Sequence, residues 1–314
     1  MSANAGDREA RTVSLVLGSG GARGLAHIGA IEALEEAGFR IVSIAGSSMG
    51  AVIGGMYAAG KLQAYRDWIC TLEQSDVLKL VDWTLSGGGL IRGERIIKRL
   101  KEMVGDVDIE DLDIDFTAVA VDIDEGREIW LSRGSLFEAI RGSIAIPGLF
   151  TPHHYHGRLL VDGGILNPVP VAPTLRSLAD LTIVVNVNAA AESRLLRKNG
   201  GKLRESDAGE QDESDGDQNV IERIRQFFNG IVDHEKLQDE TTRPGLVAML
   251  MKSLETMQSV ITRQHLAVFQ PDLVIEIPKD ACMIHEFHRA DELIEMGRRS
   301  TIKALERSGR IHDD

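Results

Sequence analysis

The distribution of apolar and polar residues along the chain predicts alternating strands and helices. Short apolar runs rich in Val and Ile indicate buried strands at 12–17, 41–45 and 181–188. Between the first two runs, apolar residues recur at helical spacing from Leu25 to Leu34, and the pattern ends at a glycine. This order of strand, loop, helix and strand predicts a parallel sheet covered by helices.

The rest of the chain continues the α/β pattern. Strands at 115–122 and 127–131, separated by Asp-Glu-Gly, predict a hairpin. Further strands are expected at 158–164 and 272–278, and helices at 61–81, 92–105, 134–141, 219–234, 244–268 and 286–307. We therefore expect a polar tail at 1–11 and a single α/β domain at 12–308.

Residues 41–60, IVSIAGSSMGAVIGGMYAAG, contain no charge and allow two interpretations. Their length and the spacing of Gly46, Gly50 and Gly54 resemble those of a packed membrane span. The alternative is a strand, a tight G-x-S-x-G turn and a helix, in which Ser48 would stand exposed as a nucleophile. Serines and glycines dilute the hydrophobicity, and no Lys or Arg cluster flanks the stretch closely, which favours the turn.

The loop GSGGARG at 18–24 follows the first strand and also has two interpretations. A dinucleotide site would need an acidic residue about twenty positions on, but the second strand ends without one. The alternative is a nest in which the amides of Gly20, Gly21 and Ala22 stabilise an oxyanion. Arg23 could brace this loop or bind a substrate phosphate, and bracing is favoured.

A base for Ser48 is suggested by Asp162, which ends an apolar strand and is followed by Gly163 and Gly164. A serine hydroxyl is a poor nucleophile at neutral pH and needs such a base. A carboxylate at the end of a buried strand could take the Ser48 proton directly. The plainer interpretation is an ordinary Asp-Gly-Gly turn.

The histidines are weaker candidates. None sits in an obvious late strand-end loop of the α/β-hydrolase type, although His285 and His288 come late enough in the chain to be tested as a base. The run at 153–156, His-His-x-His, could bind a metal, but no matching acidic or histidine motif accompanies it. A loop beside Pro152 is the favoured interpretation.

Charge and cysteine content narrow the function classes. A net charge of −13 argues against nucleic acid as a partner and against broad binding to anionic membranes. The helix at 92–105 has one basic face, which could lie on a membrane, although a core-packed helix is favoured. Cys70 and Cys282 lie far apart and fit buried thiols in a reducing compartment. The polar start indicates a cytoplasmic protein, with any membrane contact peripheral and on the inner face.

Residues 190–218 interrupt the apolar periodicity with a run of acidic residues. Too few apolar groups are present to offset the entropy of ordering, so we expect a mobile acidic insertion. A divalent-ion loop is the alternative, but the spacing does not fit the EF-hand pattern.

The motifs GSGGARG, GSSMG and DGG, in this order, resemble the oxyanion loop, nucleophile motif and aspartate motif of the patatin-like phospholipases. The segment SIAIPGLFTP at 143–152 is similar to the bacterial branch related to neuropathy target esterase. The resemblance covers 13–188 and resumes at 272–308. One departure from plant patatins is Gly18-Ser19, where their loop has Asp-Gly.

The resemblance implies a patatin-like three-layer α/β/α fold with a mostly parallel central sheet. It also implies a Ser48–Asp162 dyad that acts through an acyl-enzyme without a metal or other cofactor, with Gly20, Gly21 and Arg23 in the oxyanion loop. The expected activity is carboxylic-ester hydrolysis on lipids, as in phospholipases A and lysophospholipases. A non-catalytic protein that kept the fold and a nucleotide-binding oxidoreductase are the alternatives.

Overall fold

The computed structural model describes residues 10–84, 89–190 and 246–311, which fall into two compact units. The larger unit holds the described residues up to 190 together with 258–311, and the smaller contributes 246–257. The acidic stretch beyond residue 190 and the helix expected at 219–234 lie outside the described residues.

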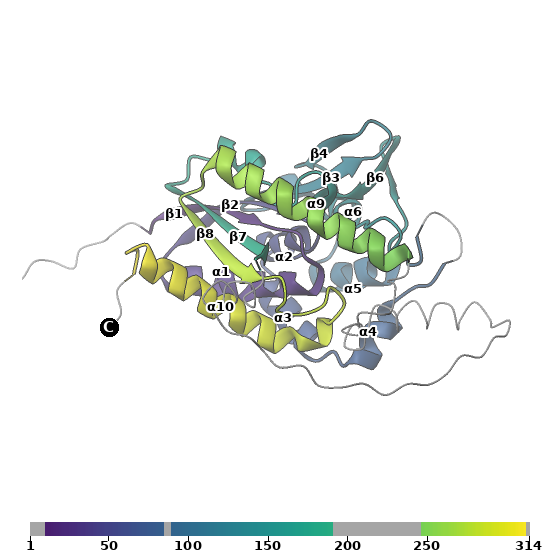
Figure 1. The fold of residues 1–314 in the computed structure, drawn as a ribbon, viewed down its shortest axis with the longest axis horizontal. Helices are drawn as coiled ribbons and strands as arrows, with labels where there is room; N and C mark the ends of the chain where they lie inside the picture. The colour runs from purple at the N-terminus through teal and green to yellow at the C-terminus, as the bar shows by residue number, and fades with distance from the viewer. Residues whose placement is uncertain (1–9, 85–88, 191–245, 312–314) are drawn as a thin grey trace, which may run out of the picture. The chain divides into compact units, whose positions relative to one another are not determined.

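A central sheet organises the larger unit. Its strands are β1 (Thr12–Leu17), β2 (Arg40–Ser47), β3 (Asp115–Asp122), β4 (Arg127–Leu131), β5 (His153–Tyr155), β6 (Arg158–Asp162), β7 (Leu181–Ala189) and β8 (Leu273–Pro278). The order is β5-β6-β3-β2-β1-β7-β8, with β4 also paired to β3 (Figure 1). Strands β3, β2, β1, β7 and β8 run parallel, whereas β4, β5 and β6 pair antiparallel. The predicted mostly parallel sheet and the β3–β4 hairpin are confirmed.

The helices follow the predicted pattern with small shifts. They are α1 (Ala26–Glu36), α2 (Met49–Ala58), α3 (Leu62–Cys70), α4 (Gln74–Leu80), α5 (Glu94–Val104), α6 (Leu136–Ser143), α9 (Leu246–Phe269) and α10 (Ala290–Arg307). Short 3₁₀ turns are η1 (Gly21–Leu25), η2 (Ile109–Asp111), η3 (Gly163–Ile165), η4 (Ala172–Arg176) and η6 (Phe287–Arg289). The single helix predicted at 61–81 is instead two helices, α3 and α4.

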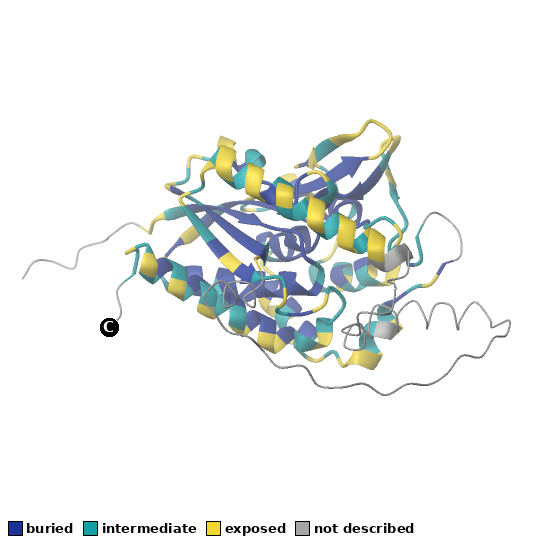
Figure 2. Cartoon of the chain, in the orientation of Figure 1, coloured by how far each residue is buried: buried dark blue, intermediate teal, exposed yellow. Residues whose placement is uncertain are grey.

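Helices cover both faces of the sheet. Successive strand side chains point to opposite faces, so Leu15 and Leu17 enter the main core while Val16 enters a second cluster. The main core includes buried residues of α1, α2, α6 and α10. Leu266 and Phe269 of α9 pack against the second cluster. Most of β1, β2, β3 and β7 is therefore buried, as Figure 2 shows, and the expected three-layer arrangement is confirmed.

The two membrane interpretations of the sequence find no support in the fold. Residues 41–60 hold all of β2 except its first residue, the turn at Ser48 and the whole of α2, as the turn interpretation predicted. Ile97 and Leu100 of α5 are buried in the main core, so this helix packs against the protein. No helix in the described part of the chain is long and apolar enough to cross a membrane.

The histidine run at 153–156 is not the predicted loop. Its first three residues, His153–Tyr155, form β5, an edge strand that pairs antiparallel with β6. The Nε2 atom of His153 lies 2.9 Å from Oε2 of Glu138. Across residues 10–84, 89–190 and 246–311, no three His, Cys, Asp or Glu side chains gather where they could hold a metal.

Candidate active site

Ser48 stands at the sharp turn between β2 and α2. Its φ of 56° and ψ of −123° are unusual for a residue with a side chain and cost roughly 1–3 kcal/mol. The turn depends on Gly46 and Gly50, because a Cβ on Gly46 would lie 2.4 Å from the Gly50 carbonyl group. A Cβ on Gly50 would lie 2.1 Å from the Leu17 oxygen. Contrary to expectation, Ser48 is buried, with only 4% of its surface exposed.

The backbone of Ser48 is held from α6. Its amide donates to Oγ of Ser143 over 2.9 Å, and that hydroxyl donates to the Val119 carbonyl over 2.6 Å. Ser143 is fully buried and ends α6. One hydroxyl therefore links the Ser48 turn to β3. This role leaves no local signal, because a serine at the end of an apolar helix belongs to no motif.

Asp162 and the Ser48 turn flank the same strand. Ser47 pairs with Val119 of β3, and Asp162 pairs with the next residue, Ala120. Because neighbouring strands lie about 4.8 Å apart, this register places the end of β2 and the end of β6 on the two sides of β3. The structure thus brings together two motifs that are more than a hundred positions apart in the sequence.

The environment of Asp162 makes its carboxylate more basic. Burial raises its pKa to about 6, while hydrogen bonding from the Ser48 hydroxyl and the Gly164 amide acts in the opposite direction. The Gly164 amide donates to Oδ1 over 2.7 Å, but Oδ2 has no partner of standard geometry among the described residues. The Ser48 contact is therefore close but not yet a well-aligned hydrogen bond. Catalytic hydrogen bonds often tighten only in the substrate complex.

Some backbone amides of the glycine-rich loop donate hydrogen bonds within the protein, and others do not. The amides of Gly18, Ser19 and Ala22 donate to the carbonyls of Val185, Pro168 and Ile284, at 3.1, 2.8 and 2.9 Å. The Ala22 amide is therefore not available to an oxyanion, contrary to the expectation from the sequence. Within the described ranges, the amides of Gly20 and Gly21 make no hydrogen bond.

Two buried side chains support this loop. Nε of Arg23 donates to the Gly20 carbonyl over 3.2 Å, and Nη1 donates to the Lys279 carbonyl over 2.7 Å. These contacts favour the bracing interpretation of Arg23. His27 of α1 lies 2.8 Å from the Gly18 carbonyl through Nε2. Burial lowers the pKa of His27 to about 4, so the ring is neutral and donates this bond. Sequence reasoning missed His27, which sits inside an ordinary helical pattern.

The same loop packs against the protein itself. A Cβ on Gly20 would lie 2.4 Å from a methyl carbon of Val187, and one on Gly21 would lie 2.6 Å from the Ile284 oxygen. Gly21 also has a φ of 57°, which favours glycine. The glycines thus make room for β7 and for the segment that precedes η6. This packing argues against the dinucleotide interpretation. His285 follows Ile284 in that segment, and His288 lies in η6.

Asn167 joins the site to α9 and was also missed from the sequence. Its carbonyl accepts a hydrogen bond from Oγ of Ser47 over 2.7 Å. Its Nδ2 donates to Glu128 over 2.7 Å, and its Oδ1 lies 3.1 Å from Nδ1 of His265 on α9. Followed by a proline, Asn167 looks like a simple turn residue in the sequence.

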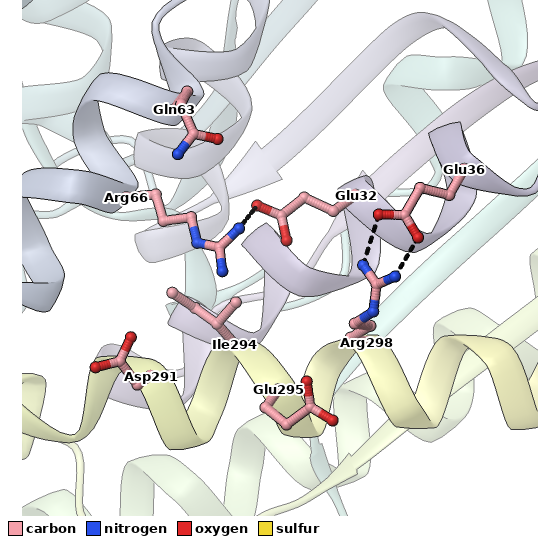
Figure 3. Close-up of a pocket in the computed structure, with 8 residues that line it drawn as sticks. All are labelled: Glu32, Glu36, Gln63, Arg66, Asp291, Ile294, Glu295 and Arg298. Atoms are coloured by element: carbon pink, nitrogen blue, oxygen red, sulfur yellow. Dashed lines mark hydrogen bonds and ion pairs between the residues drawn. The ribbon is translucent and has the colours of Figure 1, made fainter.

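A surface pocket between α1, α3 and α10 is a separate feature (Figure 3). None of the predicted site residues lines it. Arg66 is paired with Glu32, and Arg298 is paired with Glu36. Both arginines of the pocket therefore already form ion pairs with glutamates of α1.

Comparison with known proteins identifies the family. The family model "Patatin-like phospholipase" matches residues 15–175. An uncharacterized NTE family protein of Mycobacterium bovis is 40% identical over 96% of this chain and 93% of its own length. Neuropathy target esterase sws of Drosophila persimilis is 35% identical over 51% of this chain and 12% of its own. The crystal structure of VipD from Legionella pneumophila matches with a TM-score of 0.42 at 15% identity, over 96% of this chain and 67% of that one. The family match and the mycobacterial relative show that the chain belongs to the patatin-like phospholipase family.

Proposed function

We propose that this protein is a serine esterase that hydrolyses acyl esters of lipids, with Ser48 as nucleophile and Asp162 as base. The observation that carries the proposal is the strained turn of Ser48 beside a buried carboxylate with one unpaired oxygen. Membership of the patatin-like phospholipase family and a relative named as an esterase support the lipid ester as substrate. Phospholipase A and lysophospholipase activities are the specific forms we propose.

The reaction follows from these two side chains. Oγ of Ser48 attacks the ester carbonyl carbon while Oδ2 of Asp162 takes its proton. The tetrahedral intermediate then expels the alcohol oxygen, which receives that proton, and the acyl group stays on Ser48. Water attacks next, gives its proton to Asp162, and releases the fatty acid as Ser48 regains a proton. Positioned proton transfer of this kind contributes about 10²–10⁴-fold.

The developing oxyanion needs hydrogen-bond donors. The unoccupied amides of Gly20 and Gly21 are the first candidates. The amide of Met49 is a third, because it opens α2, and the first amides of a helix have no partner within that helix. Loss of one such donor costs about 3 kcal/mol in other hydrolases, so this set is a major part of the proposed mechanism.

The raised pKa of Asp162 suits a base that works alone. A general base is most effective when its pKa lies near the working pH. Burial raises the pKa of the Asp162 carboxyl from 3.8 to about 6. The carboxylate remains ionised at neutral pH yet binds a proton more readily than a solvated aspartate.

We expect contact of this protein with lipid surfaces to be peripheral.

A fluorophosphonate probe tests the proposal, because it reacts only with an activated serine. We expect labelling of the wild type, with peptide mass spectrometry locating the label on Ser48, and no labelling of Ser48→Ala. Ser47→Ala is a matched control, since it changes the neighbouring serine. A folded wild type that stays unlabelled, or carries the label elsewhere, would overturn the proposal.

A further inference from the structure

Two polar side chains lie over the glycine that holds the proposed base. A Cβ placed on Gly164 would lie 2.7 Å from Oγ of Ser19 and 2.9 Å from Nε2 of Gln258. Ser19 belongs to the glycine-rich loop, and Gln258 comes from α9. The amide of the same glycine donates to Oδ1 of Asp162. The glycine-rich loop and α9 therefore meet beside the carboxylate.

Both side chains have unused hydrogen-bonding capacity. Ser19 is 3% exposed, and its hydroxyl has no hydrogen-bond partner in the part of the chain that the structure describes. Gln258 is half-buried, and its carboxamide has no hydrogen bond to another described residue. Oδ2 of Asp162 is likewise unpaired among those residues. Buried polar groups normally have partners, so such a group calls for a ligand or a water molecule.

The chemistry of this pair favours a neutral hydroxyl as the ligand. A serine hydroxyl and a glutamine carboxamide both donate and accept hydrogen bonds, as an alcohol does, and neither is charged. A phosphate would only accept, and its negative charge would be repelled by ionised Asp162. Arg23, the cation of the same loop, is directed at the carbonyls of Gly20 and Lys279.

We propose that Ser19 and Gln258 form a subsite that binds a free hydroxyl of the alcohol part of the ester, as in a glycerol ester. The inference rests on the proposed function, because the alcohol leaves by taking a proton from Asp162. The subsite would hold the leaving polyol beside that carboxylate. By microscopic reversibility, it would also hold a polyol that replaces water as the acceptor of the acyl group.

The acceptor reaction makes the subsite measurable. A hydroxyl oxygen of the alcohol attacks the carbonyl carbon of acyl-Ser48, and its proton passes to Asp162. The bond between that carbon and Oγ of Ser48 then breaks, and Oγ takes the proton from Asp162. The products are the new ester and free Ser48. No other reactant is needed.

The test uses the full chain acylated by p-nitrophenyl butyrate, with glycerol and propan-1-ol present together at equal concentration. Mass spectrometry measures the ratio of butyrylglycerol to propyl butyrate, which does not depend on the amount of active enzyme. We expect the wild type to favour glycerol about tenfold, the effect of one hydrogen bond of ordinary strength. Gln258→Leu and Ser19→Ala should each reduce that preference several-fold.

Gln264→Leu is the matched control, because Gln264 lies exposed on the same helix. It should keep the wild-type ratio. A second competition replaces propan-1-ol by glycerol 3-phosphate, which should be a poorer acceptor than glycerol.

An acyl-enzyme that shows no preference for glycerol would overturn the subsite alone, as would preferences unchanged in both Gln258→Leu and Ser19→Ala. An equal loss of the glycerol preference in Gln264→Leu would assign the effect to a general change in α9 and would also overturn the subsite. A preference for glycerol 3-phosphate would overturn the neutral-hydroxyl assignment. Absence of butyryl-Ser48 from the intact-mass spectrum would overturn the proposed function and, with it, the subsite.

Discussion

Two aspartates at different ends of the sheet, Asp180 and the proposed base Asp162, show how environment changes the properties of a carboxylate. Asp180 lies before β7, and its Oδ2 accepts hydrogen bonds from the Thr12 amide and hydroxyl, both at 2.8 Å. Its own amide donates a hydrogen bond to the same hydroxyl oxygen over 2.9 Å. Asp162 is 3% exposed and accepts one standard hydrogen bond, from Gly164. One oxygen of the first carboxylate joins two strand ends through two hydrogen bonds, whereas Oδ2 of the second has no partner of standard geometry among the described residues.

The pKa values of the two groups move in opposite directions. Hydrogen bonds from the Thr12 amide and hydroxyl lower the pKa of Asp180, so its stabilisation is present above pH 4 and is lost as pH falls through the lowered pKa. Burial raises the pKa of Asp162 to about 6. Its folded form binds a proton more tightly than the unfolded chain, so stability is lost as pH rises from about 4 through 6. Burial of the proposed base therefore lowers the stability of the fold above about pH 4.

The largest effect on the contrast between Asp162 and Asp180 is expected from Asp162→Asn. Turnover of a short-chain nitrophenyl ester should fall about 10²–10⁴-fold, because an amide cannot accept the Ser48 proton. At pH 8 the variant should also be more stable, by up to about 3 kcal/mol, since a shift of one pKa unit corresponds to about 1.4 kcal/mol. Steady-state kinetics and denaturant melts measure the two effects. Wild-type turnover would remove Asp162 from the dyad and return attention to His285 and His288.

The pH dependence of the wild type tests the same carboxylate without a mutation. Protonated Asp162 cannot act as a base, so kcat/KM should rise about tenfold per unit below pH 6 and level off above it. The profile should be measured with a nitrophenyl ester whose own ionisation is constant over the range. An inflection near pH 4 would mean that the carboxylate behaves as a solvated aspartate. In that case the contrast with Asp180 would disappear.

The sequence predicts those parts of the site that local turns create. The elbow glycines, Ser48 and the Asp-Gly-Gly turn all depend on residues within a few positions of one another. The alternation of strand and helix likewise predicts a mostly parallel sheet. These features follow from short-range sterics and from apolar periodicity.

The remaining site residues depend on pairing that no local pattern encodes. Ser143 reaches Ser48 only because α6 packs beside β3, and Gln258 reaches Gly164 only because α9 crosses the other face. The unavailability of the Ala22 amide has the same origin, since its acceptor, Ile284, lies more than 250 positions away. The strand β5 was missed because three residues beside a proline give little periodicity.

Ser143→Ala sharpens the contrast by disturbing the proposed nucleophile, Ser48, but neither aspartate. The change leaves the Ser48 amide and the Val119 carbonyl without their shared partner, which should cost about 1–3 kcal/mol. We expect kcat to fall roughly tenfold, because a turn loosened in this way loses the alignment on which catalysis depends. Ser135→Ala is the control, since Ser135 only caps the start of the same helix. It should cost about 1 kcal/mol of stability and leave kcat unchanged. Equal losses of kcat would mean that helix stability, not the hydrogen bond, controls the nucleophile.

The smallest effect is expected from Asp180→Asn. The amide oxygen can still accept from Thr12, so only the charge is lost, and turnover should match the wild type. The melting temperature should be slightly lower at pH 7, and the difference should shrink as pH falls below 4, where wild-type Asp180 also becomes neutral. Thermal melts at pH 7 and pH 3 measure this. A difference that persists at pH 3 would assign the effect to hydrogen-bond geometry. A change in turnover would show that the two ends of the sheet are coupled, and the division between a structural and a reactive aspartate would then be wrong.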